Sequence, residues 1–210
     1  MATFDFKKER KDLYQPTTAP SIVDVPAMSF LMIDGEGDPN GKEFHHAIET
    51  LYSLAYSIRM NKTELGYYPY VVPPSEGFWD FAGQPAAPAE ITAFDKSQLI
   101  WTLVLRQPDF VTPEIVAAAQ AKVRKKKPDL HPESVRLASL TEGLCVQALH
   151  LGPYSTEPAT IHTMKKYIEQ RRFVLDYTRQ RRHHELYFNN PQKTEPGKMK
   201  TILRLPIRKR

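Results

Sequence analysis

The first part of the chain contains a short apolar run followed by apolar residues at helical spacing. Residues 27–36 form an apolar run closed by glycines, which predicts a buried strand. Over residues 44–58, apolar positions recur at steps of three and four, which predicts a helix packed on a sheet. Asn40 and Glu43, three positions apart, resemble a capping box at its start.

Strand-like residues dominate the next stretch. Residues 66–81 are rich in aromatic and β-branched side chains, but prolines interrupt them, which is typical of an edge strand or a bulge. Residues 98–106 form the clearest strand, with apolar side chains on both faces. Thr112 and Pro113 predict a second helix, because threonine caps helices and proline suits the first helical position. We expect this helix to end before Pro128.

The second half repeats this order of elements. Residues 135–140 and 144–151 are expected to pair as a hairpin that turns at Glu142 and Gly143. A helix and two strands follow. These are the helix near Pro158 and the strands over residues 183–188 and 199–207.

The order strand, helix, strand, strand therefore occurs twice. We expect an α+β protein made of two β-α-β-β units whose sheets flank a cleft. An N-terminal arm with little chemistry is expected over residues 1–26. A single domain covers residues 27–207, with the first unit and its extra helix over residues 27–127 and the second over residues 134–207. Residues 208–210 form a basic tail.

Composition excludes several protein classes. The 210 residues are 41% hydrophobic and 25% charged, and no run approaches the roughly 20 apolar residues of a membrane span. The first residues are charged rather than apolar, so we expect no secretory signal. The single cysteine, Cys145, excludes an intramolecular disulfide and suits a reducing compartment. We therefore expect a cytoplasmic protein with no membrane partner.

The net charge of +5 conceals an uneven distribution. Residues 1–121 sum to −7 and residues 122–210 to +12. Basic residues neutralise phosphates, so the second half is compatible with nucleic-acid binding. No helix-turn-helix or RNA-binding motif accompanies it, and we favour solvated helix faces and a basic tail.

One carboxylate in a predicted strand is the main candidate for chemistry. Alternation places His183, Glu185 and Tyr187 on one face, and His184 on the other, core-facing side. Glu185 would pair with a cationic ligand, or act as a general acid or base if burial raises its pKa. A salt bridge to a nearby arginine is the structural alternative.

The histidines and the single cysteine are weaker candidates for chemistry. The pairs His45-His46 and His183-His184 suggest a metal, but adjacent side chains diverge on helices and strands, and no HExxH motif is present. We therefore expect no metal site. Cys145 has no sequence context of a nucleophile and is expected to be a small buried residue.

Aromatic residues are the other informative group. Trp and Tyr combine a broad ring with a polar atom, which suits a pocket for a flat, mostly apolar ligand, although each ring taken singly is expected in the core. The candidates are Tyr67, Tyr68, Tyr70, Phe78, Trp79, Phe81, Trp101, Tyr154 and Tyr187.

Several segments resemble one known family. They are HLGPYSTEPATIHTM (150–164), RRHHELYFNNPQKTEPGKMKTILRLPI (181–207), LYSLAYSIRM (51–60), PPSEGFWDF (73–81) and IWTLVLRQPDFVT (100–112). They are similar to the GyrI-like (SbmC/GyrI) small-molecule-binding family over about residues 20–207. The resemblance is to its stand-alone branch, some members of which hydrolyse the cyclopropane ring of DNA-alkylating cyclopropanoid natural products.

The resemblance implies two SHS2-type β-α-β-β modules in a pseudo-twofold arrangement around a central pocket for bulky aromatic or cationic compounds. In that pocket Glu185 is the charge partner of the ligand, or the catalytic acid or base. Glu76 and Trp79 match a Glu-Gly-aromatic-Trp motif. Trp101 and Tyr154 match further aromatic positions near the pocket.

Other residues depart from the family pattern or fit it loosely. Tyr52 is a further ligand-binding candidate, although its helix can face away from the pocket. Asp80 stands where the stand-alone branch usually has a second tryptophan, which changes the pocket shape. The glycine that usually precedes the His-His-Glu strand is missing.

The implied hydrolysis needs no metal or cofactor. Glu185 would activate water, Tyr154 or Tyr187 would donate a hydrogen bond to the developing phenolate, and Trp79 and Trp101 would stack the flat ligand. The competing class is a drug-sequestering or sensing binder. The N-terminal arm is too short for a DNA-binding helix-turn-helix, which favours a stand-alone role. The choice between enzyme and binder, the ligand and the oligomeric state stay open at this point.

Overall fold

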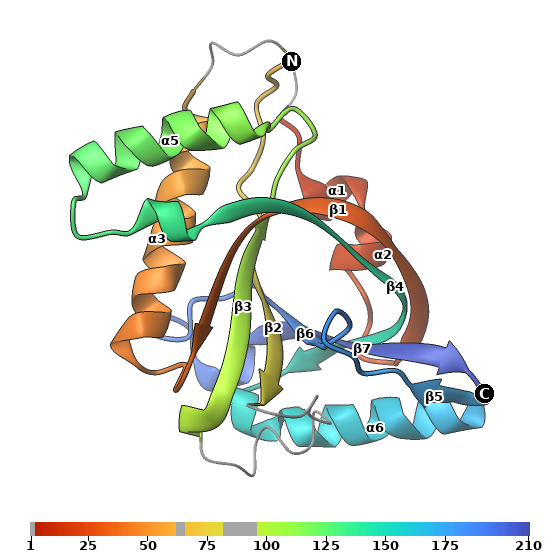
Figure 1. Cartoon of the computed structure of the whole chain (residues 1–210). Coiled ribbons are helices and arrows are strands. Elements are labelled where there is room, and N and C mark those ends of the chain that lie inside the picture. The colour runs from red at the N-terminus through yellow and green to blue at the C-terminus, as the bar shows by residue number, and fades with distance from the viewer. Residues whose placement is uncertain (1–2, 62–65, 82–95) are drawn as a thin grey trace.

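The chain combines one curved antiparallel sheet with helices, and the computed structural model describes residues 3–61, 66–81 and 96–210 (Figure 1). The strands are β1 (Ser21–Glu36), β2 (Ser75–Phe81), β3 (Leu99–Arg106), β4 (Arg136–Leu151), β5 (Phe173–Leu175), β6 (His183–Tyr187) and β7 (Lys200–Lys209). The α-helices are α1 (Phe6–Glu9), α2 (Lys11–Tyr14), α3 (Lys42–Arg59), α5 (Pro113–Lys126) and α6 (Glu157–Gln170). Single 3-10 turns are η1 (Lys96–Gln98), η2 (Pro132–Ser134), η3 (Tyr154–Thr156) and η4 (Pro196–Lys198). The α+β class expected from the sequence is confirmed.

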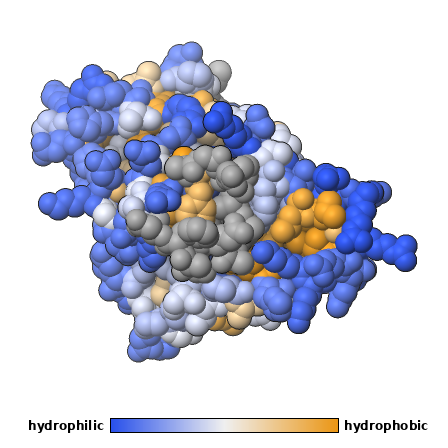
Figure 2. Space-filling model, turned by 60° about the horizontal axis from the view of Figure 1, so that its bottom comes forward, coloured by the Kyte–Doolittle hydropathy of each residue, from blue (hydrophilic) through white to orange (hydrophobic). Residues whose placement is uncertain are grey.

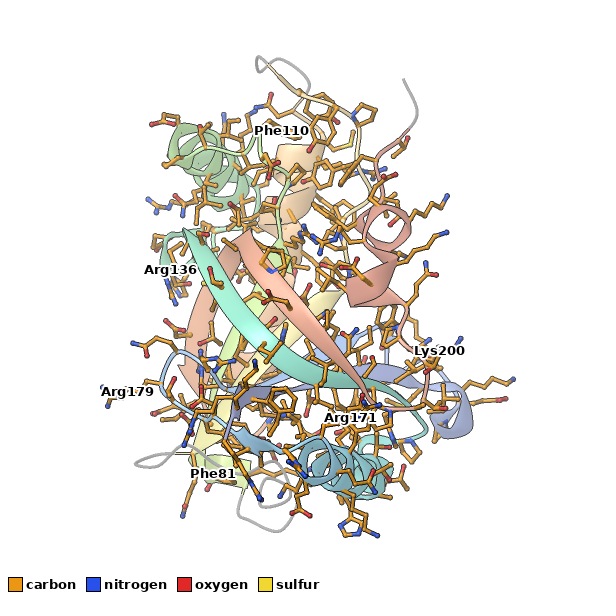
Figure 3. The ribbon with its side chains drawn as sticks, turned by 90° about the vertical axis from the view of Figure 1, so that its right-hand side faces the viewer. Phe81, Phe110, Arg136, Arg171, Arg179 and Lys200 are labelled. Atoms are coloured by element: carbon orange, nitrogen blue, oxygen red, sulfur yellow. The ribbon has the colours of Figure 1, made fainter. Side chains whose placement is uncertain are left out.

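Six strands close into a barrel-like ring. Their order is β4-β1-β3-β2-β6-β7, and β4 pairs with β7 as well as with β1, so the ring has no free end. The pairings between the described strands are antiparallel, and the short β5 pairs with the C-terminal end of β7, over Ile207–Lys209. Figure 3 shows β1 and β4 side by side along most of their length.

The two faces of the sheet carry different elements. Helices α3 and α5 pack on one face over β1, β2 and β3, and α6 packs on the same face over β4 and β7. We call this the helix face. The N-terminal α1 and α2 lie on the opposite face, the arm face, where their side chains meet Phe30, Phe78 and Leu186. The surface seen from the side of α6 is mostly hydrophilic, with one larger apolar patch at the right and smaller apolar areas elsewhere (Figure 2).

The N-terminal segment is part of the core. Strand β1 begins at Ser21, whereas the sequence pattern placed the strand at residues 27–36. Phe6, Leu13 and Tyr14, from α1 and α2, are buried on the arm face. Three apolar side chains in a short charged segment carry too little periodicity to be distinguished from a solvated arm.

Strand β4 is continuous, so the expected hairpin at Glu142 and Gly143 is wrong. Gly143 has a φ of +66°, a backbone conformation that glycine adopts without steric cost. Here the glycine bends the strand instead of reversing it. The residues of β4 up to Gln147 pair with β1, and those from Cys145 onward pair with β7. The bend thus lets one strand close the ring.

The helix starts were predicted with mixed success. Thr112 caps α5 by accepting a hydrogen bond from the Ile115 amide at 3.4 Å, with Pro113 at the first helical position, as predicted. The capping box at Asn40 is wrong. The N-cap of α3 is Gly41, because the Asn40 side chain instead donates to the carboxylate of Asp38 at 2.9 Å.

Candidate functional site

A polar chain of side chains lies on the helix face where β2 and β6 pair. Glu185 is 8% exposed, and its Oε1 lies 2.7 Å from His183 Nε2. The hydroxyl of Tyr187 donates to Glu185 Oε2 at 2.6 Å and accepts a hydrogen bond from Trp79 Nε1 at 2.7 Å. Among the described residues, the nitrogen beside the Glu185 carboxyl thus belongs to a histidine rather than to an arginine. We call these four side chains the Glu185 cluster.

Local strand geometry explains this arrangement. His183, Glu185 and Tyr187 alternate along β6 and so share one face. Across the ladder, Trp79 pairs with His183 and Gly77 with Glu185. A Cβ atom at Gly77 would lie 3.0 Å from Trp79 Nε1 and 3.1 Å from the Tyr187 hydroxyl. The absence of a side chain at Gly77 therefore leaves the space in which the indole and the phenol meet.

The start of α6 adds two further side chains. The Tyr154 ring packs edge-on against the Tyr187 ring at 5.9 Å, and Tyr154 is 36% exposed. Burial and the negative charge of Glu185 raise the pKa of Tyr154. Glu157 is 4% exposed, and burial and then the charge of Glu185 raise its pKa well above the ordinary value. This edge of the cluster thus favours neutral, protonated side chains.

Burial also keeps the Tyr187 hydroxyl protonated. Desolvation and then the charge of Glu185 raise the pKa of Tyr187 well above the ordinary value. Tyr187 therefore remains a hydrogen-bond donor at neutral pH. The cluster thus offers an accepting carboxylate and a neutral phenol beside a tryptophan.

Trp101 and Tyr52 contact other parts of the helix face. Trp101 is 2% exposed and lies over Gly35, where a Cβ atom would come within 2.0 Å of the indole. Its ring contacts Phe44 edge-on at 5.2 Å. The hydroxyl of Tyr52 accepts a hydrogen bond from the Ser75 amide at 3.1 Å. Trp101 is thus a core side chain, linked to the Glu185 cluster through Phe44, which also stacks on the indole of Trp79 at 5.7 Å.

Tyr52 also lines a separate surface pocket. This pocket has a volume of about 650 Å³ and lies between α3 and α5. The exposed Tyr56 and Met60 are on its wall, together with Lys122 and Lys126. Neither Glu185 nor Tyr187 is among its lining residues.

Glu76 lies on the arm face, away from Glu185. It pairs across the ladder with Leu186, one position out of phase with Glu185, and is fully buried. The Tyr14 hydroxyl donates to Glu76 Oε1 at 3.1 Å, and His184 Nε2 lies 3.1 Å from its other oxygen. Of the sequence-predicted site residues, the structure therefore groups Glu185, Trp79, Tyr187 and Tyr154, and places Glu76 on the opposite face.

Comparison with known proteins decides the family. The sequence profile of the GyrI-like small molecule binding domain matches residues 18–208. The chain belongs to the GyrI-like family. No curated protein matches the sequence.

Solved structures resemble this GyrI-like chain along its whole length. A hydrolase from Listeria innocua is 43% identical, covers 98% of this chain and 100% of its own, and superposes with a TM-score of 0.88. An uncharacterized conserved protein from Listeria innocua is 44% identical over 98% of this chain and 100% of its own, with a TM-score of 0.89. The EcmrR C-terminal domain, at 10% identity, covers 91% of this chain and 98% of its own with a TM-score of 0.54, and shows the shared fold alone.

Sequence reasoning missed two members of this GyrI-like site. Alternation placed His183 on the face of Glu185, but its pairing with that carboxylate depends on a side-chain rotamer that the sequence does not encode. Glu157 is the first residue of α6, a position where acids are common because they favour the helix dipole. Its sequence context therefore indicated only an ordinary helix start.

Three further observations concern the described residues of the GyrI-like chain. They contain no group of three or more His, Cys, Asp or Glu side chains arranged to hold a metal ion. None of their helices is long and apolar enough to cross a membrane. Cys145 is a free thiol that is 1% exposed, and burial raises its pKa, which confirms the prediction of a small buried residue.

Proposed function

We propose that this GyrI-like protein binds bulky aromatic electrophiles at the Glu185 cluster and hydrolyses them without a metal or cofactor. The observation that carries this proposal is the buried Glu185 carboxylate, oriented by His183 and Tyr187 beside the indole of Trp79. A relative that is 43% identical over 98% of this chain is described as a hydrolase, which supports catalysis. Cyclopropanoid compounds are the substrate class we favour, and cytoplasmic detoxification is the role.

The strand pairings support a pair of modules around this site. In the first half, β1-α3-β2-β3 pair in the order β1-β3-β2, and in the second half β4, β7 and β6 pair in the same sense around α6. The halves join at β2–β6 and at β1–β4. The Glu185 cluster is at the first junction, with Phe44 of α3 on Trp79 and Tyr154, just before α6, on Tyr187. A ligand cleft between two SHS2-type modules is therefore our interpretation of this region.

The chemistry follows from the polarity of the cluster. A cyclopropane conjugated to a dienone opens when water attacks a ring carbon. The new C–O bond forms as the ring C–C bond breaks, and the electron pair of the broken C–C bond moves to the carbonyl oxygen. Glu185 takes the proton of the attacking water, while the oxygen takes a proton and becomes a phenol. Neutral Tyr154 is placed to donate a hydrogen bond to that oxygen.

A non-catalytic binder is the second candidate. Tyr187 binds the Glu185 carboxyl and contacts Trp79 and Tyr154. A carboxylate beside aromatic rings attracts a cation through both charge and ring faces. In that case Glu185 is the charge partner and no bond is broken. Both candidates use the same residues, so turnover alone separates them.

The test is incubation of the purified protein with a duocarmycin-type cyclopropanoid, followed by mass spectrometry. We expect the compound to gain one water, and Glu185→Gln to lower the rate at least about 100-fold because it removes the base. Glu195→Gln is the matched control, since Glu195 is exposed and pairs only with exposed Lys198 among the described residues. Tight binding of unchanged compound establishes the binder, and full turnover by Glu185→Gln rejects Glu185 as the base.

A further inference from the structure

Glu157 is a buried carboxyl group that the reaction above does not use. It is the first residue of α6 and is 4% exposed. Among the described residues, its Oε1 has no hydrogen-bond partner. A buried oxygen without a partner is costly, and more so when the group is ionised. An unpartnered carboxyl in such a place therefore calls for an explanation.

Its position relative to Glu185 is informative. The Thr201 side chain on β7 lies near the Glu157 carboxyl, although its hydroxyl makes no hydrogen bond among the described residues. Thr201 is the cross-strand partner of Tyr187, so it lies beside the backbone end of that side chain. Glu185, in contrast, binds the hydroxyl end of Tyr187. The two carboxyl groups thus lie near opposite ends of one tyrosine side chain.

The surroundings of Glu157 favour its neutral form. The titratable groups that face it are Glu185 and Tyr187 from β6 and Tyr154 from η3. His150 of β4 is nearby on the same face, but Thr160 and Thr156 at the start of α6 bind its ring nitrogens at 2.8 and 3.1 Å. None of these named neighbours therefore offers Glu157 a positively charged partner. Burial and the charge of Glu185 together raise the pKa of Glu157, and Thr201 opposes this only in part.

The two glutamates differ in what they are equipped to do. Both oxygens of Glu185 have partners, His183 Nε2 at 2.7 Å and the Tyr187 hydroxyl at 2.6 Å. Glu157 has a free oxygen and a negative neighbour, which is the environment of a carboxylic acid. Two carboxyl groups whose environments differ in this way are the usual pattern of an acid and base pair.

We propose that Glu157 is the proton donor of this site and acts on a ligand oxygen while Glu185 accepts the proton of water. This inference rests on the proposed function. Its substrate class is a strained or activated ring conjugated to a carbonyl, whose opening leaves the electron pair on oxygen. The O–H bond of Glu157 breaks as the new O–H bond of the phenol forms. Glu157 ends as a carboxylate and Glu185 as an acid, and proton exchange with solvent restores both.

The first test is the pH dependence of kcat/KM with the same duocarmycin-type compound. For the wild type we expect a fall in rate on the alkaline side as Glu157 loses its proton. Glu157→Gln should lose at least about 100-fold in rate and should also lose that alkaline fall, because an amide cannot transfer a proton. Glu157→Asp should recover part of the rate. Glu169→Gln, an exposed position on α6, is the matched control.

The second test does not require turnover. Infrared difference spectra of the wild type against Glu157→Gln report whether this carboxyl is protonated at pH 7, and whether its C=O band shifts when the compound binds. A protonated band that shifts supports the proposal. An ionised Glu157 at pH 7, or an alkaline limb unchanged in Glu157→Gln, overturns it. Absence of turnover with a protonated, shifting Glu157 rejects the hydrolase instead and leaves a hydrogen-bond donor to a bound ligand.

Discussion

At the scale of single residues, Gly77 controls the contact between the two rings of the Glu185 cluster. Gly77→Ala places a methyl group 3.0 Å from Trp79 Nε1 and 3.1 Å from the Tyr187 hydroxyl. We expect the indole and the phenol to separate, with a loss of about 1–2 kcal/mol in the free energy of unfolding. Ligand affinity should fall with it, because Tyr187 no longer holds Glu185 in place. Urea unfolding and titration of tryptophan fluorescence measure both effects.

Gly197→Ala is the control for this change. A Cβ atom there meets nothing within 4 Å, so the substitution tests the general cost of replacing a glycine. Equal effects of the two substitutions would show that the contact between Trp79 and Tyr187 is not sensitive to the space at Gly77.

Residue-level prediction from the sequence worked where one physical period decides the outcome. The period of two along a strand placed Glu185 and Tyr187 on one face, as observed. The same period could not place Glu76 relative to them, because the register of two paired strands decides which of their side chains share a face. Gly77, not Glu76, turned out to pair with Glu185. A shift of one residue in register moves a side chain to the opposite face.

At the scale of elements, the bend of β4 at Gly143 closes the ring. Gly143 has a φ of +66°, which is strained for any residue with a Cβ atom, although the nearest atom to such a Cβ lies 3.9 Å away. The cost of Gly143→Ala therefore comes from the backbone conformation and not from steric crowding. We expect a loss of about 1–2 kcal/mol in the free energy of unfolding. Gly143→Asn should lose less, because asparagine tolerates this conformation better than alanine.

Urea unfolding of the three proteins orders them as wild type, Gly143→Asn and Gly143→Ala. If the asparagine variant were the least stable, side-chain crowding rather than backbone conformation would govern this position. The same bend explains why the hairpin was predicted wrongly. A glycine after a polar residue is typical of both a turn and a bent strand. Only the pairing of β4 with two neighbouring strands decides between them.

At the scale of the whole molecule, a buried ionic network joins the N-terminal helices to the arm face of the sheet. Arg204 of β7 is 1% exposed, and its guanidinium contacts Glu142 Oε1 at 3.2 Å and the carbonyl of Leu13 in α2 at 2.6 Å. His184 is fully buried between Glu142 and Glu76, with ring nitrogens at 3.0 and 3.1 Å from them. These residues lie far apart in the sequence, so no local pattern could group them. Their pairing requires the closed ring.

This network should make stability depend on pH through His184. Burial lowers the pKa of His184, but the charge of Glu142 and hydrogen bonds to the carboxylates raise it more, so the net shift is above 6.5. The folded state therefore keeps a proton that the unfolded state loses. The stabilisation is complete below about pH 6.5 and is lost as pH rises through the folded pKa, with a limiting slope of about 1.4 kcal/mol per pH unit.

Glu157 acts in the same direction, since its raised pKa also means that the folded state holds an extra proton. Comparison with Glu157→Gln removes that contribution and isolates His184. We expect the free energy of unfolding of Glu157→Gln, measured by urea titration from pH 6.5 to 8, to fall with pH, and the fall to be absent in the double variant with His184→Gln. The range ends at pH 8 because the thiol of the unfolded chain ionises above it. His131→Gln is the matched control, because the His131 side chain is 72% exposed. A flat profile in Glu157→Gln would mean that His184 is neutral in the fold, and that Glu142 relies on Arg204 alone for a positive charge.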